Sequence, residues 1–531
     1  MTESEKKVGS AVMEGEIETN PKQLTQHFKM RHDGKDLKKR SVRSGTVTIA
    51  AQVTQLGLQT ASNVVLARLL VPQDYGIIAM VLAVTAFVEV FKDMGLSTAT
   101  IQREELTYAQ VSTMFWLNIL VGTILTVFVM ALAPALVWFY QKRELLWVTI
   151  ALSMTFVVSG FGIQHAALLN REMRFRALAV VQVSSVGTGI IASILAALAG
   201  LGYWALVLGT LVNSVVRVVF LWALSKWRPG RPERGSGAGA LFHFGADVTG
   251  FELANYLARN LDNVLIGRVW GGEVLGLYSR AYSLLMLPIN NLRSPLHAVA
   301  FPAMSHLQRD PVRFRAYLRK YISLLAFASM PIAACLFVCS DNVIHLLLGN
   351  RWMGASEIFR VLTLTAFIQP VASAARGSAM LSSGLSRRYL WWGVANSTVM
   401  AAAFGIGIFW GPIGVALGYG AANYLILYPS LCYAFDGTPI KVADFFGTTA
   451  KAAIASLVAG GIALTLKNNV AWSHDLTALL GCGAAFLFAY LAAFLALPGG
   501  WRELREYLSY RSLLVGRGLK KVPLEQVVPV R

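Results

Sequence analysis

Long apolar segments recur along the whole of this chain and are separated by short polar connections. Each holds roughly eighteen residues or more, enough for a helix to cross about 30 Å of hydrocarbon. The pattern predicts about fourteen such helices, at 45–70, 75–102, 109–138, 145–169, 177–199, 203–224, 241–269, 274–304, 315–348, 355–382, 389–410, 413–434, 442–466 and 476–497. We therefore expect an all-α, polytopic membrane protein.

One stretch of sequence repeats itself at an offset of two hundred residues. SNVVLARLLVPQDYGIIAM, which starts at Ser62, aligns without a gap with DNVLIGRVWGGEVLGLYSR, which starts at Asp262. The shared Asn, Arg and Gly positions are harder to obtain by chance than shared Val or Leu. The repeat predicts two homologous six-helix lobes, related by a pseudo-two-fold axis along the membrane normal, with a binding site between them.

Basic residues are concentrated in alternate connections. Most of the 47 Lys and Arg lie in the two tails and in the loops near 171, 226, 309 and 387, whereas the opposite loops hold Lys142, Arg143, Arg351 and Lys467. This asymmetry is the positive-inside pattern and predicts that both termini are cytoplasmic. The net charge of +19 then follows from topology rather than from nucleic-acid binding. Basic inner loops also attract anionic lipid headgroups.

These features predict the organisation of the chain. We expect a cytoplasmic N-terminal tail at 1–44, an N-lobe at 45–224, a cytoplasmic linker at 225–240, a C-lobe at 241–434, two further helices at 435–497 and a cytoplasmic C-terminal tail at 498–531. The outer loops are too short for a catalytic domain, and the sequence has no phosphate-binding P-loop motif. The prediction is a transporter rather than an enzyme, with no resident cofactor or metal.

Polar side chains inside apolar segments are costly and are therefore candidate site residues. Gln59 belongs to a polar face of the first segment, and the repeat pairs that face with Glu252, Asn255 and Arg259 in the seventh. The two faces are expected to meet across a hydrated cleft. The alternative is that they form hydrogen bonds that only hold the helices together.

The second and eighth segments carry another group of polar residues. Glu89 and Asp93 lie four residues apart, and the repeat places Arg293 opposite Asp93. A pair between Asp93 and Arg293 would form a gate on the cytoplasmic side. In the alternative interpretation, Lys92 neutralises Asp93 while Arg293 extends to the lipid headgroups. Arg280 lies nearer the outer side.

Acids in the seventh segment are candidates for coupling transport to H⁺ or Na⁺. These acids are Asp247, Glu252 and Asp262, and Asp262 lies within one helical turn of Arg259. The alternative is that Asp262 is a permanent partner of Arg259. Arg376 lies within reach of the inner surface, and we interpret it as extending to the headgroups.

Two blocks of this sequence resemble a known family. LARLLVPQDYGIIAMVLAVTAFVEVFKDMGLSTATIQ and LDNVLIGRVWGGEVLGLYSRAYSLLMLP are similar to bacterial polysaccharide exporters of the Wzx type, especially their colanic-acid and succinoglycan branch. The resemblance covers about residues 38–460. It implies the multidrug/oligosaccharidyl-lipid/polysaccharide superfamily fold, a bacterial inner-membrane location and two C-terminal helices that form a groove for a polyprenyl tail. It also implies cationic cavity residues that bind pyrophosphate.

The residues and the resemblance agree on the cargo. Arg259, Arg280 and Arg293, with Gln59 and Asn255, would bind a polyprenyl-pyrophosphate-linked oligosaccharide, because arginine offers a permanent, planar cation to phosphate. The predicted function is export of such units for exopolysaccharide or lipopolysaccharide biosynthesis by alternating access. The expected partners are this substrate, membrane lipids and a polysaccharide polymerase or chain-length regulator. The alternatives are a cation-coupled multidrug antiporter of the same superfamily and a membrane polymerase.

Overall fold

The computed structural model describes residues 34–89, 91–92, 97, 100–101, 106–232 and 260–514, with side chains from residue 50 to residue 507 within these ranges. Several candidate residues lie outside the described residues, namely Asp93, Asp247, Glu252, Asn255 and Arg259. The gate between Asp93 and Arg293 therefore stays a prediction.

The first part of the chain is helical wherever the structure describes its predicted segments. Its helices are α2 (Gly34–Leu69), α3 (Pro72–Glu89), α5 (Tyr108–Tyr140), α6 (Glu144–Arg171), α7 (Phe175–Leu198) and α8 (Trp204–Leu224). Local sequence sets several of their ends. Thr107 and Gln110 form a reciprocal capping box at the start of α5. Gly200 and Gly202 have positive φ angles of 76° and 54°, which allows the tight reversal between α7 and α8.

The second part begins with a helical stretch at 260–269 and continues through a series of long helices. These are α10 (Gly271–His306), α11 (Pro311–Val338), α12 (Ser340–Leu347), α13 (Gly354–Ser382), α14 (Ser386–Gly407), α15 (Gly411–Leu425) and α16 (Leu427–Phe435), with short 3₁₀ turns at Asn350–Trp352 and Ile408–Trp410. Three more helices follow, α17 (Val442–Asn469), α18 (Asp475–Ala496) and α19 (Gly500–Leu514). α10 stays continuous although Pro288, Pro295 and Pro302 lie within it.

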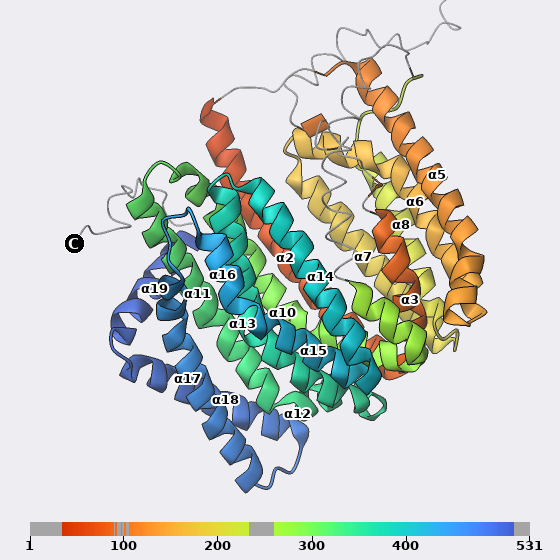
Figure 1. The fold of residues 1–531 in the computed structure, drawn as a ribbon. Helices are drawn as coiled ribbons and strands as arrows, with labels where there is room; N and C mark the ends of the chain where they lie inside the picture. The colour runs from red at the N-terminus through yellow and green to blue at the C-terminus, as the bar shows by residue number, and fades with distance from the viewer. Residues whose placement is uncertain are drawn as a thin grey trace, which may run out of the picture.

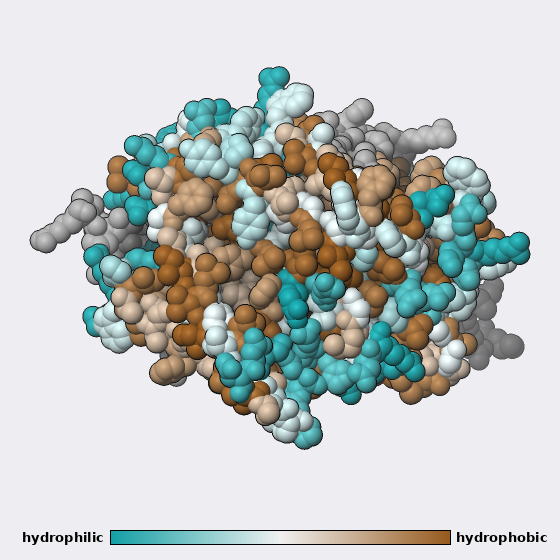
Figure 2. Space-filling model, turned by 60° about the horizontal axis from the view of Figure 1, so that its bottom comes forward, coloured by the Kyte–Doolittle hydropathy of each residue, from teal (hydrophilic) through white to brown (hydrophobic). Residues whose placement is uncertain are grey.

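Nine helical stretches in the described part of the chain are long and apolar enough to cross a membrane. The Ser386–Leu425 stretch, which holds α14 and α15, counts as one of the nine, while α2, α3 and α10 are not among them. Large apolar side chains are exposed on these helices, for example Phe128 at 50%, Trp138 at 75% and Phe488 at 77%. Figure 2 shows apolar surface across the middle of the molecule and hydrophilic residues towards its upper, right and lower edges. The protein is a multi-pass, all-α membrane protein, as predicted.

The helices form two groups that lie side by side (Figure 1). α5, α6, α7 and α8 pack together and are joined by α2 and α3, whereas α10, α11 and α13 to α16 form the second group. α17 packs against α11 and α18, so the additional helices lie on the flank of the second group. At one end this flank is held by Lys467, which forms an ion pair with Asp341 of α12 at 3.3 Å.

The start of the predicted linker is docked on the first group. Gly230 N–H donates to the Ser112 hydroxyl at 3.0 Å, and the Trp116 indole donates to the Gly230 carbonyl at 2.8 Å. The Tyr108 hydroxyl donates to the Arg228 carbonyl at 2.8 Å, and the Trp227 side chain is buried. Residues 227–230 therefore contact the first group of helices.

The two groups meet mainly where α3 crosses α10. A Cβ atom added to Gly76 would lie 1.7 Å from the Gly272 carbonyl oxygen, and one added to Gly276 would lie 1.8 Å from the Pro72 carbonyl oxygen. Positions 72 and 272, and positions 76 and 276, are equivalent in the sequence repeat. The contact is thus reciprocal, as a pseudo-two-fold axis requires, and only glycine fits at its centre.

We expect Gly76→Ala to force α3 and α10 apart, since overpacking a tight contact costs about 1–3 kcal/mol or more. Spin labels at Lys142 and Arg351, on the predicted outer loops of the two lobes, should give a longer inter-label distance in this variant by electron–electron resonance. Gly57→Ala is the matched control, because nothing lies within 4 Å of the Cβ it would add. An unchanged distance in a folded Gly76→Ala protein would contradict the expectation that this crossing holds the two lobes together on their predicted outer side.

Candidate functional site

A cavity of about 570 Å³ lies inside the second group of helices. Helical residues 260–262 and helices α10, α13, α14 and α15 form its walls. Its lining is mostly polar or aromatic and includes Asn260, Asp262, Tyr282, Asn290, Arg293, Gln369, Ser373, Arg376, Tyr389, Trp392, Asn396, Tyr419 and Asn423. We call this space the C-lobe cavity. A polar cavity enclosed by membrane helices suits a hydrated, hydroxyl-rich ligand.

Arg376 is the most deeply buried cation of the C-lobe cavity, with only 6% of its surface exposed. Its Nη1 donates to the Ser430 hydroxyl of α16 at 2.9 Å, and its guanidinium lies 5.3 Å from the centre of the Trp392 ring. Its Nε–H is buried without a hydrogen-bond partner in the described residues. The interpretation of Arg376 as a headgroup-facing residue is wrong, because α13 turns this side chain towards α16 inside the bundle.

The charges that line the cavity are unequal. Arg293 and Arg376 both line it, and neither forms an ion pair within 4.0 Å with a carboxylate of the described residues. Asp262 is the one acid among the lining residues that the structure describes. A buried arginine without a counter-ion is costly, so this arrangement favours an anionic ligand that would complete the charge.

Asp262 is 6% exposed and is held by two hydrogen bonds. The Tyr278 hydroxyl donates to Oδ2 at 3.0 Å, and the Asn263 N–H donates to Oδ1 at 2.8 Å. No described Lys, Arg or His lies within ion-pair distance of this carboxylate. Its predicted partner Arg259 lies outside the described residues. Asp262 and Arg293 are the two sequence-predicted site residues that the structure brings into one cavity.

Arg280 joins the two groups of helices. Its Nη1 donates to Asn63 Oδ1 at 3.0 Å, and its guanidinium carbon lies 3.8 Å from the centre of the Tyr75 ring. Both partners belong to the N-lobe, whereas Arg280 belongs to α10. Such a close cation–π contact is strong when it is shielded from water. Arg280 is therefore placed at the contact between the lobes and is not part of the lining of the C-lobe cavity.

Further contacts close the same end of the molecule. The Trp352 indole donates to the Ala67 carbonyl at 2.7 Å, and its ring meets Tyr75 edge to face at 5.2 Å. Arg68 Nη2 donates to the Leu346 carbonyl at 2.8 Å. Each of these contacts joins α2 or α3 to the C-lobe. Together with the glycine crossing, they close one end of the interface between the lobes, which is the outer end in the topology predicted from the sequence.

The remaining candidates are placed elsewhere. Gln59 is exposed on α2, while Gln55 of the same polar face receives a hydrogen bond from Gln182 of α7. Part of this face therefore serves packing within the N-lobe, as the alternative interpretation proposed. Glu89 ends α3, is 60% exposed and pairs with Lys92 at 3.3 Å.

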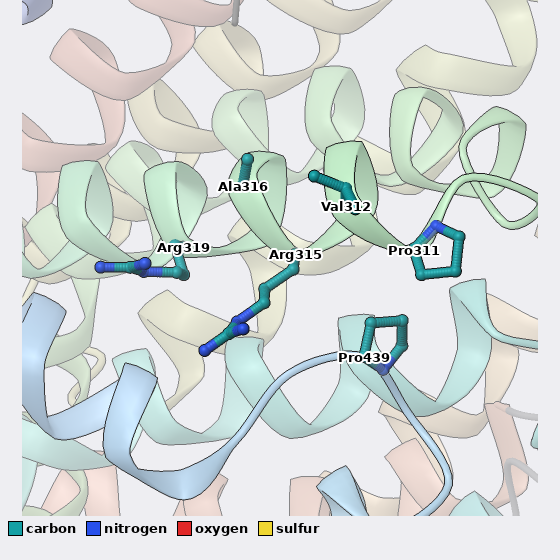
Figure 3. Close-up of a pocket in the computed structure, with 6 residues that line it drawn as sticks. All are labelled: Pro311, Val312, Arg315, Ala316, Arg319 and Pro439. Carbon is teal, nitrogen blue, oxygen red and sulfur yellow. The ribbon is translucent and has the colours of Figure 1, made fainter. Parts of the chain in front are cut away.

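A second, smaller hollow of about 490 Å³ lies at the predicted inner end of α11. Pro311, Val312, Arg315, Ala316, Arg319 and Pro439 line it (Figure 3). Arg315 forms a bidentate pair with Asp444 through Nε at 2.8 Å and Nη2 at 2.9 Å. In the sequence, these arginines are interpreted only as part of the positive-inside pattern that predicts the orientation of the chain.

Two bundles of membrane helices that meet in a reciprocal contact, with a polar cavity at bilayer depth, define a protein of the transporter class. The chain belongs to the polysaccharide biosynthesis protein family, whose profile matches residues 65–357. The family resemblance predicted from the sequence is confirmed.

Named relatives agree with this assignment. The chain is 27% identical over 390 residues to the lipopolysaccharide biosynthesis protein WzxC of Escherichia coli. The aligned region covers 72% of this chain and 78% of that protein. It is 23% identical over 403 residues to the succinoglycan biosynthesis transport protein ExoT of Rhizobium meliloti, covering 74% and 80%. In structure it is similar to the lipid II flippase MurJ in its inward closed conformation, with a TM-score of 0.69, 13% identity and coverage of 88% and 100%. The last likeness concerns the fold.

We expect Arg280→Ala and Tyr75→Leu to weaken the outer closure, because each removes a shielded cation–π contact of about 2 kcal/mol. This loss corresponds to a change of roughly thirty-fold in the equilibrium constant between the closed and the open state. A cysteine at Ser373, in the lining of the C-lobe cavity, should then react faster with a membrane-impermeant thiol reagent added from outside. Tyr75→Phe keeps the ring and should label at the wild-type rate. Equal labelling of all four proteins would show that this contact does not close the outer side.

Proposed function

We propose that this protein moves polyprenyl-pyrophosphate-linked oligosaccharides across the bacterial inner membrane, for exopolysaccharide or lipopolysaccharide biosynthesis. The observation that carries the proposal is the pair Arg293 and Arg376 in the C-lobe cavity, neither of which has a carboxylate partner in the described part of the chain. Membership of the polysaccharide biosynthesis protein family supports it. Both chain termini lie in the cytoplasm in this proposal, in accordance with the distribution of basic residues.

A pyrophosphate in the membrane interior needs permanent cations, and guanidinium groups supply them with directed N–H donors. The buried Nε–H of Arg376 is an unused donor of this kind. Tyr389, Trp392 and Tyr419 add aromatic surface to the cavity, and Asn290 and Asn396 add amide groups. Hydroxyl-rich sugars can use both kinds of contact. The cavity thus combines the two recognition chemistries that the proposed cargo requires.

The same charges argue against export of cationic drugs. A cavity that selects cations needs carboxylates in excess, whereas the described lining of this one holds Arg293 and Arg376 against Asp262 alone. A polymerase would additionally need a set of catalytic groups outside the membrane. Polymerisation is assigned in this proposal to a partner protein that receives the exported units.

Transport by alternating access follows from the closed outer end. Cargo reaches the cavity from the inner side while the crossing of α3 and α10 stays closed, and release outside requires this crossing to separate. Arg280 would then lose Asn63 and Tyr75 as partners. The open state must offset that loss, and a bound anion near the lobe interface is one group that can do so.

The first test replaces Arg376. In a strain that lacks the gene, Arg376→Ala should restore little export, with at least a tenfold loss, because a hydrogen bond to a charged group is worth about 1.5–3 kcal/mol. The lipid-linked oligosaccharide should accumulate on the inner leaflet, and Arg376→Lys should recover part of the activity. Arg217→Ala is the matched control, since Arg217 is exposed on α8. Normal export by a folded Arg376→Ala protein would refute the assignment of this residue to the cargo site.

We further propose that Asp262 couples transport to an H⁺ or Na⁺ gradient, since it is a buried acid of the cavity without a described basic partner. In vesicles, a gradient of the coupling ion should accelerate flipping by the wild type but not by Asp262→Asn. Glu273→Gln should behave as wild type, because Glu273 is exposed at the start of α10. The coupling role fails if the wild-type rate ignores both gradients or if Asp262→Asn keeps the full response.

A further inference from the structure

The segment after the last membrane helix is a structured element. Residues 498–531 are predicted from the sequence to form a cytoplasmic tail, and the structure shows that their first part forms α19, a helix of 15 residues. It follows α18 after a short turn in which Gly499 has a φ of 79°, a value that favours glycine. α19 packs back on α18, so it stays close to the point where the chain leaves the membrane.

The acids of α19 face the protein. Glu503 pairs with Lys451 of α17, and Glu506 pairs with Lys320 of α11. The Tyr507 hydroxyl shares a hydrogen bond of 2.6 Å with Ser323 of α11. These contacts fix one side of α19 against two different membrane helices, and they use both of its acidic residues.

The bases among the described side chains of α19 take no part in these contacts. Arg502 and Arg505 are exposed, and neither pairs with a carboxylate of the described residues. Trp501 is 61% exposed, and the Arg505 guanidinium lies 5.7 Å from the centre of its ring. Because both acids are engaged in ion pairs, the exposed surface of α19, here called its free side, carries two arginines without a described carboxylate partner beside an exposed aromatic ring.

We propose that α19 is an in-plane membrane helix whose free side binds the phosphate headgroups of anionic phospholipids in the inner leaflet. Arg502 and Arg505 would contact the phosphates, and Trp501 would lie at the level of the headgroups, where tryptophan is favoured. Charge complementarity selects this occupant, because the cytoplasmic leaflet is anionic and the free side of α19 is basic. The proposal concerns a surface outside the C-lobe cavity and does not depend on which cargo is moved.

The hollow at the start of α11 shows the same excess of positive charge. Arg315 and Arg319 share the single buried carboxylate of Asp444, with the Arg319 Nε at 3.7 Å. Their side chains are 40% and 49% exposed, so the two cations reach the solvent there while the carboxylate between them is buried (Figure 3). This second site lies on the helix that also holds α19 through Lys320. The predicted inner rim around α11 and α19 is thus basic at two places.

The experiment measures phospholipid binding to the purified full-length protein by native mass spectrometry. The wild type should retain more phosphatidylglycerol than phosphatidylcholine at equal lipid concentration. The double substitution R502Q/R505Q should reduce retained phosphatidylglycerol at least threefold and leave phosphatidylcholine unchanged. The control K142Q/R143Q removes two basic residues from the predicted outer face and should retain phosphatidylglycerol as the wild type does.

The midpoint of thermal unfolding serves as the control for correct folding. R502Q/R505Q should leave this midpoint unchanged, because both side chains are exposed. The proposal is overturned if this variant retains phosphatidylglycerol like the wild type. It is overturned equally if both lipids bind the wild type alike, or if K142Q/R143Q causes the same loss. Export activity is not the readout, so failure of the proposed cargo would leave this result unaffected.

Discussion

The architecture depends on a backbone contact between α3 and α10. The carbonyl oxygens of Gly272 and Pro72 occupy the places where Gly76 and Gly276 would carry side chains. Small residues allow membrane helices to approach this closely. This contact joins backbone to backbone and contains no flexible side chain that could extend to keep it when α3 and α10 partly separate. The contact is therefore either made or lost, as expected of an element with two discrete states.

The close approach also brings longer side chains into place. With α3 against α10, Arg280 reaches Tyr75 and Asn63, and Trp352 reaches the Ala67 carbonyl. A cation that would otherwise be expensive in the membrane is thus shielded by an aromatic face and an amide. Arg376 is stabilised in a related way by Trp392 and Ser430, but its Nε–H stays unsatisfied within the described structure. The lobe contact is complete in this state, whereas the cavity is electrostatically incomplete.

The sequence predicted the features that depend mainly on one class of residue, either apolar or charged. Apolar runs located the helices. Burial cost selected Arg293 and Asp262 as candidate site residues with separate roles, and the structure places both in the lining of the C-lobe cavity. For Arg376 it failed, because hydrophobic periodicity gives the depth of a residue but not the neighbour it faces, and Ser430 lies in another helix. α19 was missed for a similar reason, since its acids find their partners Lys320 and Lys451 far away in the chain.

The contacts of the first linker residues with the N-lobe indicate where this chain can be divided into its two lobes. Trp227 and Gly230 are held by the N-lobe through Tyr108, Ser112 and Trp116. The first group of helices therefore ends with a closing segment that extends at least to Gly230. A gene split within 233–240 would leave this segment on the correct fragment. The two lobes could then be produced as separate polypeptides that reassemble through the glycine crossing.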